Sequence, residues 1–370
     1  METDRILDLT DLATAAGPFL SVRLTTEPAV ENAGPRSHLR WQGLRQELLA
    51  DGVPDDLLAL VDPFVVDAHR WGRVLHVVVT GEGGVFVEHL DRQDGSDERE
   101  ARYEWLPWTI PVLAARQRRV PHLVVLTDRR GADLVVVRRD GVELDAEVTA
   151  SEEPIPRVAQ SDWHAWAEHR YQRRAENSWE RNAGEVATEV VRLARWAQPR
   201  VIFVAGDVRA VQFLRDDLPS DLAALVRVVD GQRLRPRGNG GVTGDVTEVL
   251  DADHDDELAA LLARFAEESG QRDRAVAGFD QTIAALAAGQ VETLLIAEDP
   301  GDEAEAWFDA DPAHLAVSEA AAAALGWSGL RPGRRREAVV RAAIGTGAEV
   351  RVIPRGAGPA EDVGALLRWR

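Results

Sequence analysis

At residues 160–197 the chain reads QSDWHAWAEHRYQRRAENSWERNAGEVATEVVRLARWA. A polar loop with two tryptophans and two histidines runs here into a segment whose apolar side chains recur at helical spacing from Tyr171 to Leu193. The pattern predicts a helix over 167–197 that ends before Pro199, about 45 Å long at about 1.5 Å per residue. The segment therefore predicts a strand–loop–helix unit that presents a loop at one end.

Strand signals lie on both sides of this helix. We predict strands at 122–127, 134–138, 142–148, 201–205 and 225–229, and a short helix at 208–214. Three strands before the long helix and two after it predict a mixed sheet. We assign this block, residues 120–250, to a central domain.

The two flanking blocks also alternate between helical and strand periodicity. In the first block we expect strands at 19–24, 74–80 and 85–90, helices at 39–49 and 55–70, a polar loop at 91–100 and a proline-containing linker at 105–112. In the last block we expect helices at 257–269, 274–288, 318–325 and 334–345, and strands at 293–297, 349–353 and 363–369. The chain is thus predicted to be an α/β (α+β) protein of three domains. These are an N-terminal α/β domain at 1–119, the central domain at 120–250 and an α/β/α sandwich at 251–370.

The composition excludes several classes of protein. The net charge of −20 repels nucleic acid and anionic membranes, so any RNA contact must come from local basic patches. The absence of cysteine excludes disulfides, cysteine-ligated zinc and thiol catalysis. No apolar run approaches the roughly 18–20 residues of a membrane span, and the N-terminus lacks the features of a signal peptide. We expect a soluble cytoplasmic protein that is a monomer on its own.

Three segments together resemble one family. These are PHLVVLTDRRGADLVVV at 121–137, the strand–loop–long-helix order over 121–204, and the closing run VGALLRW at 363–369 after a glycine-rich turn. They are similar to the archaeal and eukaryotic peptide-release factors and Pelota, and more closely to the bacterial branch of that family, which includes the hibernation factor Balon. Vms/Ankzf-type peptidyl-tRNA hydrolases are related. The resemblance covers residues 121–370 and, within the bacterial branch, the first block as well.

The resemblance implies a fold and a set of partners. The family has three domains that occupy the ribosomal A site much as a tRNA would, with the central domain reaching the peptidyl-transferase centre. The third domain is similar to ribosomal proteins of the L7Ae/L30e type. The resemblance also implies two partners, the ribosome and a translation GTPase such as elongation factor Tu.

This chain departs from the family at the catalytic motif. In hydrolytic members the loop before the long helix carries Gly-Gly-Gln, whose glutamine helps to position water at the peptidyl-tRNA ester. Here no glycine lies between Ser161 and Arg174, and Gln160 and Gln172 are the glutamines nearby. Two glycines would supply backbone freedom and close approach to RNA. We therefore expect a factor that occupies the A site without hydrolysis, in hibernation, rescue or stress. One alternative is a peptidyl-tRNA hydrolase with Gln172 as its catalytic candidate, and another is an interaction protein that retains only the fold.

The loop and the first helical turns form the candidate rRNA-binding tip that the resemblance implies. Its candidate contacts are Trp163, His164, Trp166, His169, Arg170, Arg173 and Arg174, together with Arg235 and Arg237 in a separate glycine-rich segment. Arginine binds phosphate and tryptophan stacks on bases. Both residue types can also have a purely structural role. The arginines can pair with the glutamates at 168, 176 and 180, and the tryptophans can pack against other side chains.

Two charged clusters remain. The acidic residues at 251–256 suit the N-terminus of the next predicted helix better than a metal site, so we expect no metal and no other cofactor. The arginines at 331, 334, 335 and 336 stand at the start of another predicted helix, where positive charge opposes the helix dipole. We therefore expect these arginines to bind a partner, and RNA is one candidate.

Overall fold

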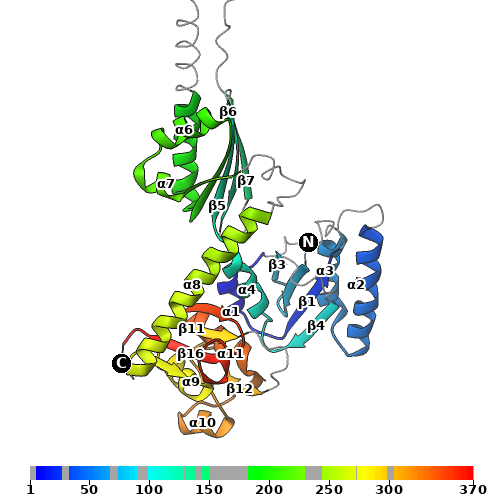
Figure 1. The fold of residues 1–370 in the computed structure, drawn as a ribbon. Helices are drawn as coiled ribbons and strands as arrows, with labels where there is room; N and C mark the ends of the chain where they lie inside the picture. Colours follow the sequence, from blue (N-terminus) through cyan, green and yellow to red (C-terminus); the bar gives the residue numbers. More distant parts are fainter. Residues whose placement is uncertain are drawn as a thin grey trace, which may run out of the picture. The chain divides into compact units, whose positions relative to one another are not determined.

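The structure is a computed structural model. It describes residues 6–26, 33–66, 74–90, 99–128, 131–138, 143–149, 182–229, 244–271, 273–297 and 304–369. The chain divides into two compact units (Figure 1), one formed by Met1–Gln117 with Glu257–Arg370 and the other by Arg118–Asp256. We call the second the central unit. The division into three domains stays a prediction, whereas the predicted α/β multidomain class is confirmed.

The central unit is built on a five-stranded mixed sheet. Its strands are β5 (His122–Thr127), β6 (Gly131–Val137), β7 (Glu143–Thr149), β8 (Val201–Gly206) and β9 (Val226–Val228), in the order β7-β6-β5-β8-β9. β5 runs parallel to β8 and β8 parallel to β9, whereas β6 is antiparallel to both of its neighbours. The predicted mixed sheet is therefore confirmed.

Helices cover the sheet of the central unit on the face that buries Val125, Leu134 and Ile202. A helix over residues 182–197 packs its Val190 and Leu193 against this face. The short helices α6 (Val208–Asp217) and α7 (Ser220–Leu225) lie beside the same sheet (Figure 1). The predicted long helix is confirmed over 182–197, and its earlier part lies outside the described residues.

The first part of the other unit is an antiparallel sheet with helices on both faces. The strands are β1 (Phe19–Thr25), β2 (Val74–Thr80), β3 (Val85–Leu90) and β4 (Arg99–Glu104), in the order β3-β2-β1-β4. Alternation along β1 sends Leu20 and Val22 toward α2 (Ala33–Ala50) and α3 (Asp55–Val66). It sends Phe19 to the opposite face, where α1 (Leu9–Thr14) and α4 (Ile110–Arg118) pack.

The last part of the chain forms the predicted α/β/α sandwich. Its sheet has the order β10-β16-β11-β15, with β10 at Ala275–Ala277, β11 at Val291–Ala297, β15 at Glu349–Ile353 and β16 at Val363–Leu367. The helix α8 (Gly244–Gln271) covers one face with Leu258 and Phe265, and α9 (Phe279–Ala287) and α11 (Arg335–Gly345) cover the other (Figure 1). A small sheet of β12 (Glu305–Phe308), β13 (Leu315–Ala316) and β14 (Arg331–Arg334), the helix α10 (Glu319–Ala324) and the short turn η1 (Ala360–Asp362) complete it.

Several predicted boundaries are wrong. The helix predicted at 274–288 begins only at Phe279, since Ala275–Ala277 pairs with β16 as a strand. The acidic residues at 251–256 lie inside α8, which begins at Gly244, so they do not cap a helix. The linker predicted at 105–112 contains the start of α4, and the helix predicted at 334–345 follows a strand that ends at Arg334.

No helix within the described ranges is both long enough and apolar enough to cross a membrane.

Candidate functional site

The ends of four strands meet at one edge of the central sheet. Thr127, the last residue of β5, stands opposite Gly206 of β8 and close to Ala132 of β6, while Gly131 of β6 pairs with Thr149, the last residue of β7. We call these strand ends, with the adjoining Asp128, the carboxyl edge. Loops at the carboxyl ends of parallel strands are a common place for binding sites in α/β folds.

The segment predicted to carry function is attached to the carboxyl edge at both ends. β7 ends there at Thr149, and on the other side of the segment Asn182 and Ala183 line the same small pocket as Thr127 and Asp128. The chain thus leaves the sheet and returns to it within one site. The strand pairing explains this placement, because β7 is antiparallel to β6 and the helix over 182–197 leads back to β8.

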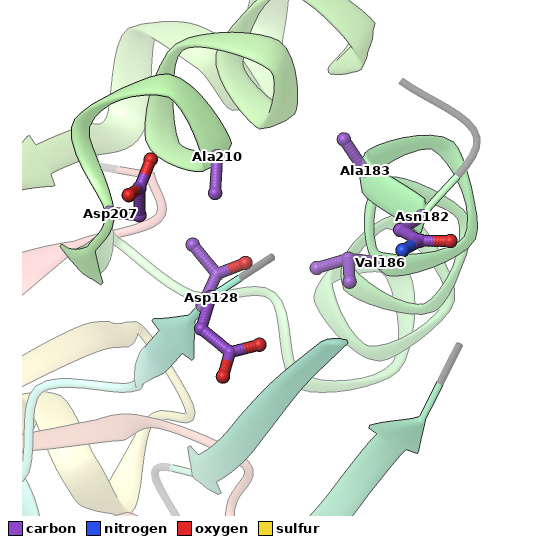
Figure 2. A pocket seen from close by; sticks show the side chains of 7 residues that line it. Asp128, Asn182, Ala183, Val186, Asp207 and Ala210 are labelled. Atoms are coloured by element: carbon purple, nitrogen blue, oxygen red, sulfur yellow. The ribbon is translucent and has the colours of Figure 1, made fainter. Parts of the chain in front are cut away.

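The pocket at the carboxyl edge is small. It is lined by Thr127, Asp128, Asn182, Ala183, Val186, Asp207 and Ala210 and has a volume of about 10 Å³ (Figure 2). In Figure 2 Ala210 lies on α6 and Asp207 stands directly before that helix, whereas Asn182, Ala183 and Val186 come from the facing helix. A volume of this size holds about one water molecule. Among the described residues the pocket therefore has room for little more than one water molecule.

Both carboxylates of the pocket accept hydrogen bonds from backbone N–H groups. Asp128 Oδ1 accepts a hydrogen bond of 3.0 Å from the backbone N–H of Gly131, which closes the turn between β5 and β6. Asp207 Oδ1 accepts one of 3.0 Å from the N–H of Arg209 and so caps α6. The sequence analysis did not single out Asp207, although an aspartate directly before a predicted helix is a typical N-cap signal. Its place beside Asp128 depends on the sheet.

A larger, open depression of about 510 Å³ adjoins the carboxyl edge. Its lining includes Leu126, Asp128, Asp133, Glu147 and Ala205. Asp133 and Glu147 stand directly opposite each other on β6 and β7. Among the described residues that line it, three are acidic and none is basic.

Gly206 allows the two central strands to approach each other. Its φ of +141° is one that residues with a side chain rarely adopt, and a Cβ atom there would stand 1.6 Å from the carbonyl oxygen of Thr127. A glycine is therefore required at this position of the carboxyl edge.

All the predicted site residues lie outside the described residues. Gln172, Trp163, His164, Trp166, His169, Arg170, Arg173 and Arg174 fall within 151–181, and Arg235 and Arg237 fall within 230–243. The structure places the attachment points of the first group and leaves their roles as predictions.

Contacts within the protein account for the four clustered arginines and for one residue of the acidic cluster. Arg331 lies over the ring of Trp105 at 4.0 Å, Arg334 pairs with Glu104 at 2.8 Å, Arg335 lies over Phe279 at 3.6 Å, and Arg336 donates to the carbonyl of Ala297 at 3.0 Å. In the acidic cluster, Asp253 pairs with Arg200 at 2.8 Å. No group of residues suited to a metal ion is found in the part of the chain that the structure describes.

The central block, which contains the carboxyl edge, is similar to a known family. The sequence model of bacterial archaeo-eukaryotic release factor family 2 matches residues 121–271, which include β5 to β9, the helix over 182–197 and α8. The chain is 26% identical over 369 residues to uncharacterized protein Rv2629 of Mycobacterium tuberculosis (strain ATCC 25618 / H37Rv), with 97% of this chain and 95% of the relative covered.

Similar solved structures come from archaea and yeast. Archaeal translation termination factor aRF1 is 16% identical, with 98% of this chain and 95% of that chain covered and a TM-score of 0.26. Pelota of Archaeoglobus fulgidus is 16% identical, with 81% of each chain covered and a TM-score of 0.33. Dom34 of S. cerevisiae is 10% identical, with 82% of this chain and 81% of that chain covered and a TM-score of 0.39. Residues 121–271 of this chain are thus similar to bacterial archaeo-eukaryotic release factor family 2.

Proposed function

We propose that this protein is a translation factor that binds the ribosome and presents residues 150–181 to the rRNA of the A site and peptidyl-transferase centre without hydrolysing peptidyl-tRNA. The observation that supports this most is the family match over 121–271, which spans that segment together with the carboxyl edge at which both of its ends are attached. A segment fixed at both ends to a rigid sheet can be presented as a unit to a large partner.

The charge of the protein makes the predicted arginines essential to this proposal. A net charge of −20 opposes association with RNA. Arg170, Arg173 and Arg174 would have to overcome this repulsion by pairing with phosphates, and Trp163 and Trp166 would add stacking on unpaired bases. His164, His169, Arg235 and Arg237 are the further proposed contacts.

The first prediction concerns ribosome binding. At low salt the full chain should co-sediment with bacterial ribosomes, and replacing Arg170, Arg173 and Arg174 together by glutamine should weaken binding about tenfold or more. Each lost phosphate contact should also lower the slope of log K against log salt by about 0.7–0.9. Binding would be measured by sedimentation at several salt concentrations.

A matched control removes two arginines from the described part of the same helix. Arg192 and Arg195 are exposed, and Arg192 is paired with Glu189 on the same helix. Their replacement by glutamine should leave ribosome binding unchanged. A wild-type protein that does not co-sediment at low salt would contradict the proposal and favour the alternative of an interaction protein without a ribosomal role.

The second prediction concerns hydrolysis. We expect no release of peptide when the protein is added to ribosomes that carry peptidyl-tRNA in the P site, because the loop before the helix has no Gly-Gly-Gln. Release would be followed as free labelled peptide, with puromycin as the positive control for reactive complexes. Release by wild type that disappears in Gln172→Ala would instead establish the alternative, a peptidyl-tRNA hydrolase.

The remaining parts of the proposal are the role in hibernation, rescue or stress, a cytoplasmic location, and a translation GTPase such as elongation factor Tu as partner. The third domain is the family's contact for such a GTPase. Addition of elongation factor Tu to the sedimentation experiment tests this part, since a partner should increase the amount of the factor on ribosomes.

A further inference from the structure

The first turn of α4 receives a carboxylate from a distant part of the chain. Glu337 lies in the first turn of α11 and is only 4% exposed. Its Oε2 atom accepts hydrogen bonds from the backbone N–H of Thr109 at 3.1 Å and from the Thr109 hydroxyl at 2.9 Å. The backbone N–H of Ile110, the first residue of α4, also bonds to this carboxyl group. Glu337 thus occupies the N-terminus of α4, where a negative charge is favourable.

Residues 104–117 are fixed to the C-terminal sandwich at three further places. Glu104 binds Arg334 at 2.8 Å and 3.0 Å. The side-chain amide of Gln117 donates to the carbonyl of Val352 at 2.7 Å and accepts from its N–H at 2.8 Å, as a neighbouring strand would. Leu106, Ile110 and Ala114 are members of the same hydrophobic core as α9 and α11. We call this contact of residues 104–117 with the sandwich the junction.

Opposing effects act on the pKa of Glu337. Burial raises the pKa of Glu337 to about 7, whereas the hydrogen bonds from Thr109, the charge of Arg102 on β4 and the hydrogen bond from Ile110 lower it. Arg334 and Glu104 stand near Arg102. The guanidinium of Arg102 lies 3.6 Å from the ring centre of Trp108. The ring of Trp108 also contacts Arg23 and His76. Burial is the largest of these effects, so the pKa of Glu337 lies close to neutral pH.

We propose that Glu337 is a proton-sensitive latch, in which gain or loss of one proton sets how firmly residues 104–117 and α4 are held to the C-terminal sandwich. The inference is independent of ribosome binding, since it concerns contacts inside the unit formed by Met1–Gln117 and Glu257–Arg370.

The direction of the effect follows from linkage. A carboxyl group with a pKa of about 7 in the closed junction and 4.5 in water binds its proton more tightly when the junction is closed. The junction is therefore most stable below pH 4.5, and it weakens as the pH rises toward 7. In that window the equilibrium constant for opening rises by up to about tenfold per pH unit, and above pH 7 it levels off.

Hydrogen exchange of the full chain tests the latch. Opening constants for peptides of α4 and α11 would be measured from pH 5 to pH 8, with correction for the intrinsic pH dependence of exchange, in wild type and Glu337→Gln. The ratio of wild-type to variant opening constants should rise roughly 70-fold over this range, most of it below pH 7. As a control, Val339→Ala removes buried apolar contact from α11 without a titratable group, so its ratio to wild type should not change with pH.

Variants of Thr109 test the same latch without removing the carboxyl group. Thr109→Val deletes one donor to the ionised form, so the pH at which opening levels off should rise, and Thr109→Ser should restore the wild-type profile. This comparison remains decisive if Glu337→Gln does not fold. Parallel pH profiles for wild type and Glu337→Gln, or a Thr109→Val profile identical to wild type, would overturn the proposal.

Discussion

Replacing Gly206 by alanine is expected to destabilise the central unit by about 4 kcal/mol or more, a size reserved for substitutions with severe steric conflict. The added Cβ atom would lie 1.6 Å from the carbonyl oxygen of Thr127, and the backbone φ of +141° is strained for any residue with a side chain. Relief requires β5 and β8 to separate at the carboxyl edge. Urea unfolding of the full chain, followed by hydrogen exchange of peptides from β5 and β8, measures the loss.

A second glycine of the central unit supplies the matched control. A Cβ atom at Gly184, in the helix over 182–197, would meet only Asp217 Oδ2 at 3.7 Å, which is ordinary contact. Gly184→Ala should therefore stabilise the unit by about 0.5–1 kcal/mol through helix propensity. A Gly206→Ala protein as stable as Gly184→Ala would show that the two strands do not approach as closely as described.

The second large effect is acid sensitivity caused by His76. This residue of β2 is 0% exposed, and its Nε2 atom lies 2.8 Å from the carbonyl oxygen of Trp108. Within the described structure its Nδ1 atom is buried without a hydrogen-bond partner. Burial, and then the charge of Arg23, lowers the pKa of His76 to about 3, so the imidazole is neutral in the folded protein and Nε2–H donates to Trp108.

The sign of the pH effect follows from this lowered pKa. The unfolded chain takes up a proton near pH 6.5, whereas the folded chain resists until about pH 3, so the stability contribution is complete above pH 6.5 and is lost as the pH falls toward 3. The free energy of unfolding should fall by about 5 kcal/mol relative to His76→Gln over this range, at about 1.4 kcal/mol per pH unit.

Denaturant unfolding at several pH values, in both proteins, measures this difference. The comparison removes the contributions of other titrating groups, which the two proteins share. Val77→Ala lowers the stability of the same strand without removing a titratable group, and its curve should run parallel to that of wild type. A constant difference between wild type and His76→Gln from pH 7 to pH 4 would contradict the prediction.

Strands and helices with strong local periodicity could be predicted from the sequence. The hairpin of β2 and β3 has β-branched runs on both sides of a glycine turn, and each strand has its predicted bounds. The short strands β10, β12 and β14 were not predicted. β14 has the sequence RPGR, which favours no strand by itself and becomes one by pairing with β12. Short polar segments of this kind depend on partners far along the chain.

The arginines near residue 334 show the same limit for a candidate site. By sequence alone, positive charge at the start of a helix opposes the helix dipole, which made RNA a candidate. In the structure Glu104 lies 230 residues from Arg334 in the chain and pairs with it. Conversely, the candidate tip at 160–174 rests entirely on residue types and family resemblance, because those residues lie outside the described ranges.

The sequence by itself determined the α/β class, most of the long elements, the family of the central block and the absence of a Gly-Gly-Gln motif, because each depends on residues that are neighbours in the chain. Only the tertiary structure decided where the chain enters and leaves residues 150–181, why Gly206 is required, and that Glu337 caps a helix that begins more than 200 residues earlier. Those features depend on close approach and on burial, which change the energies of a side chain and a proton only after distant segments have packed together.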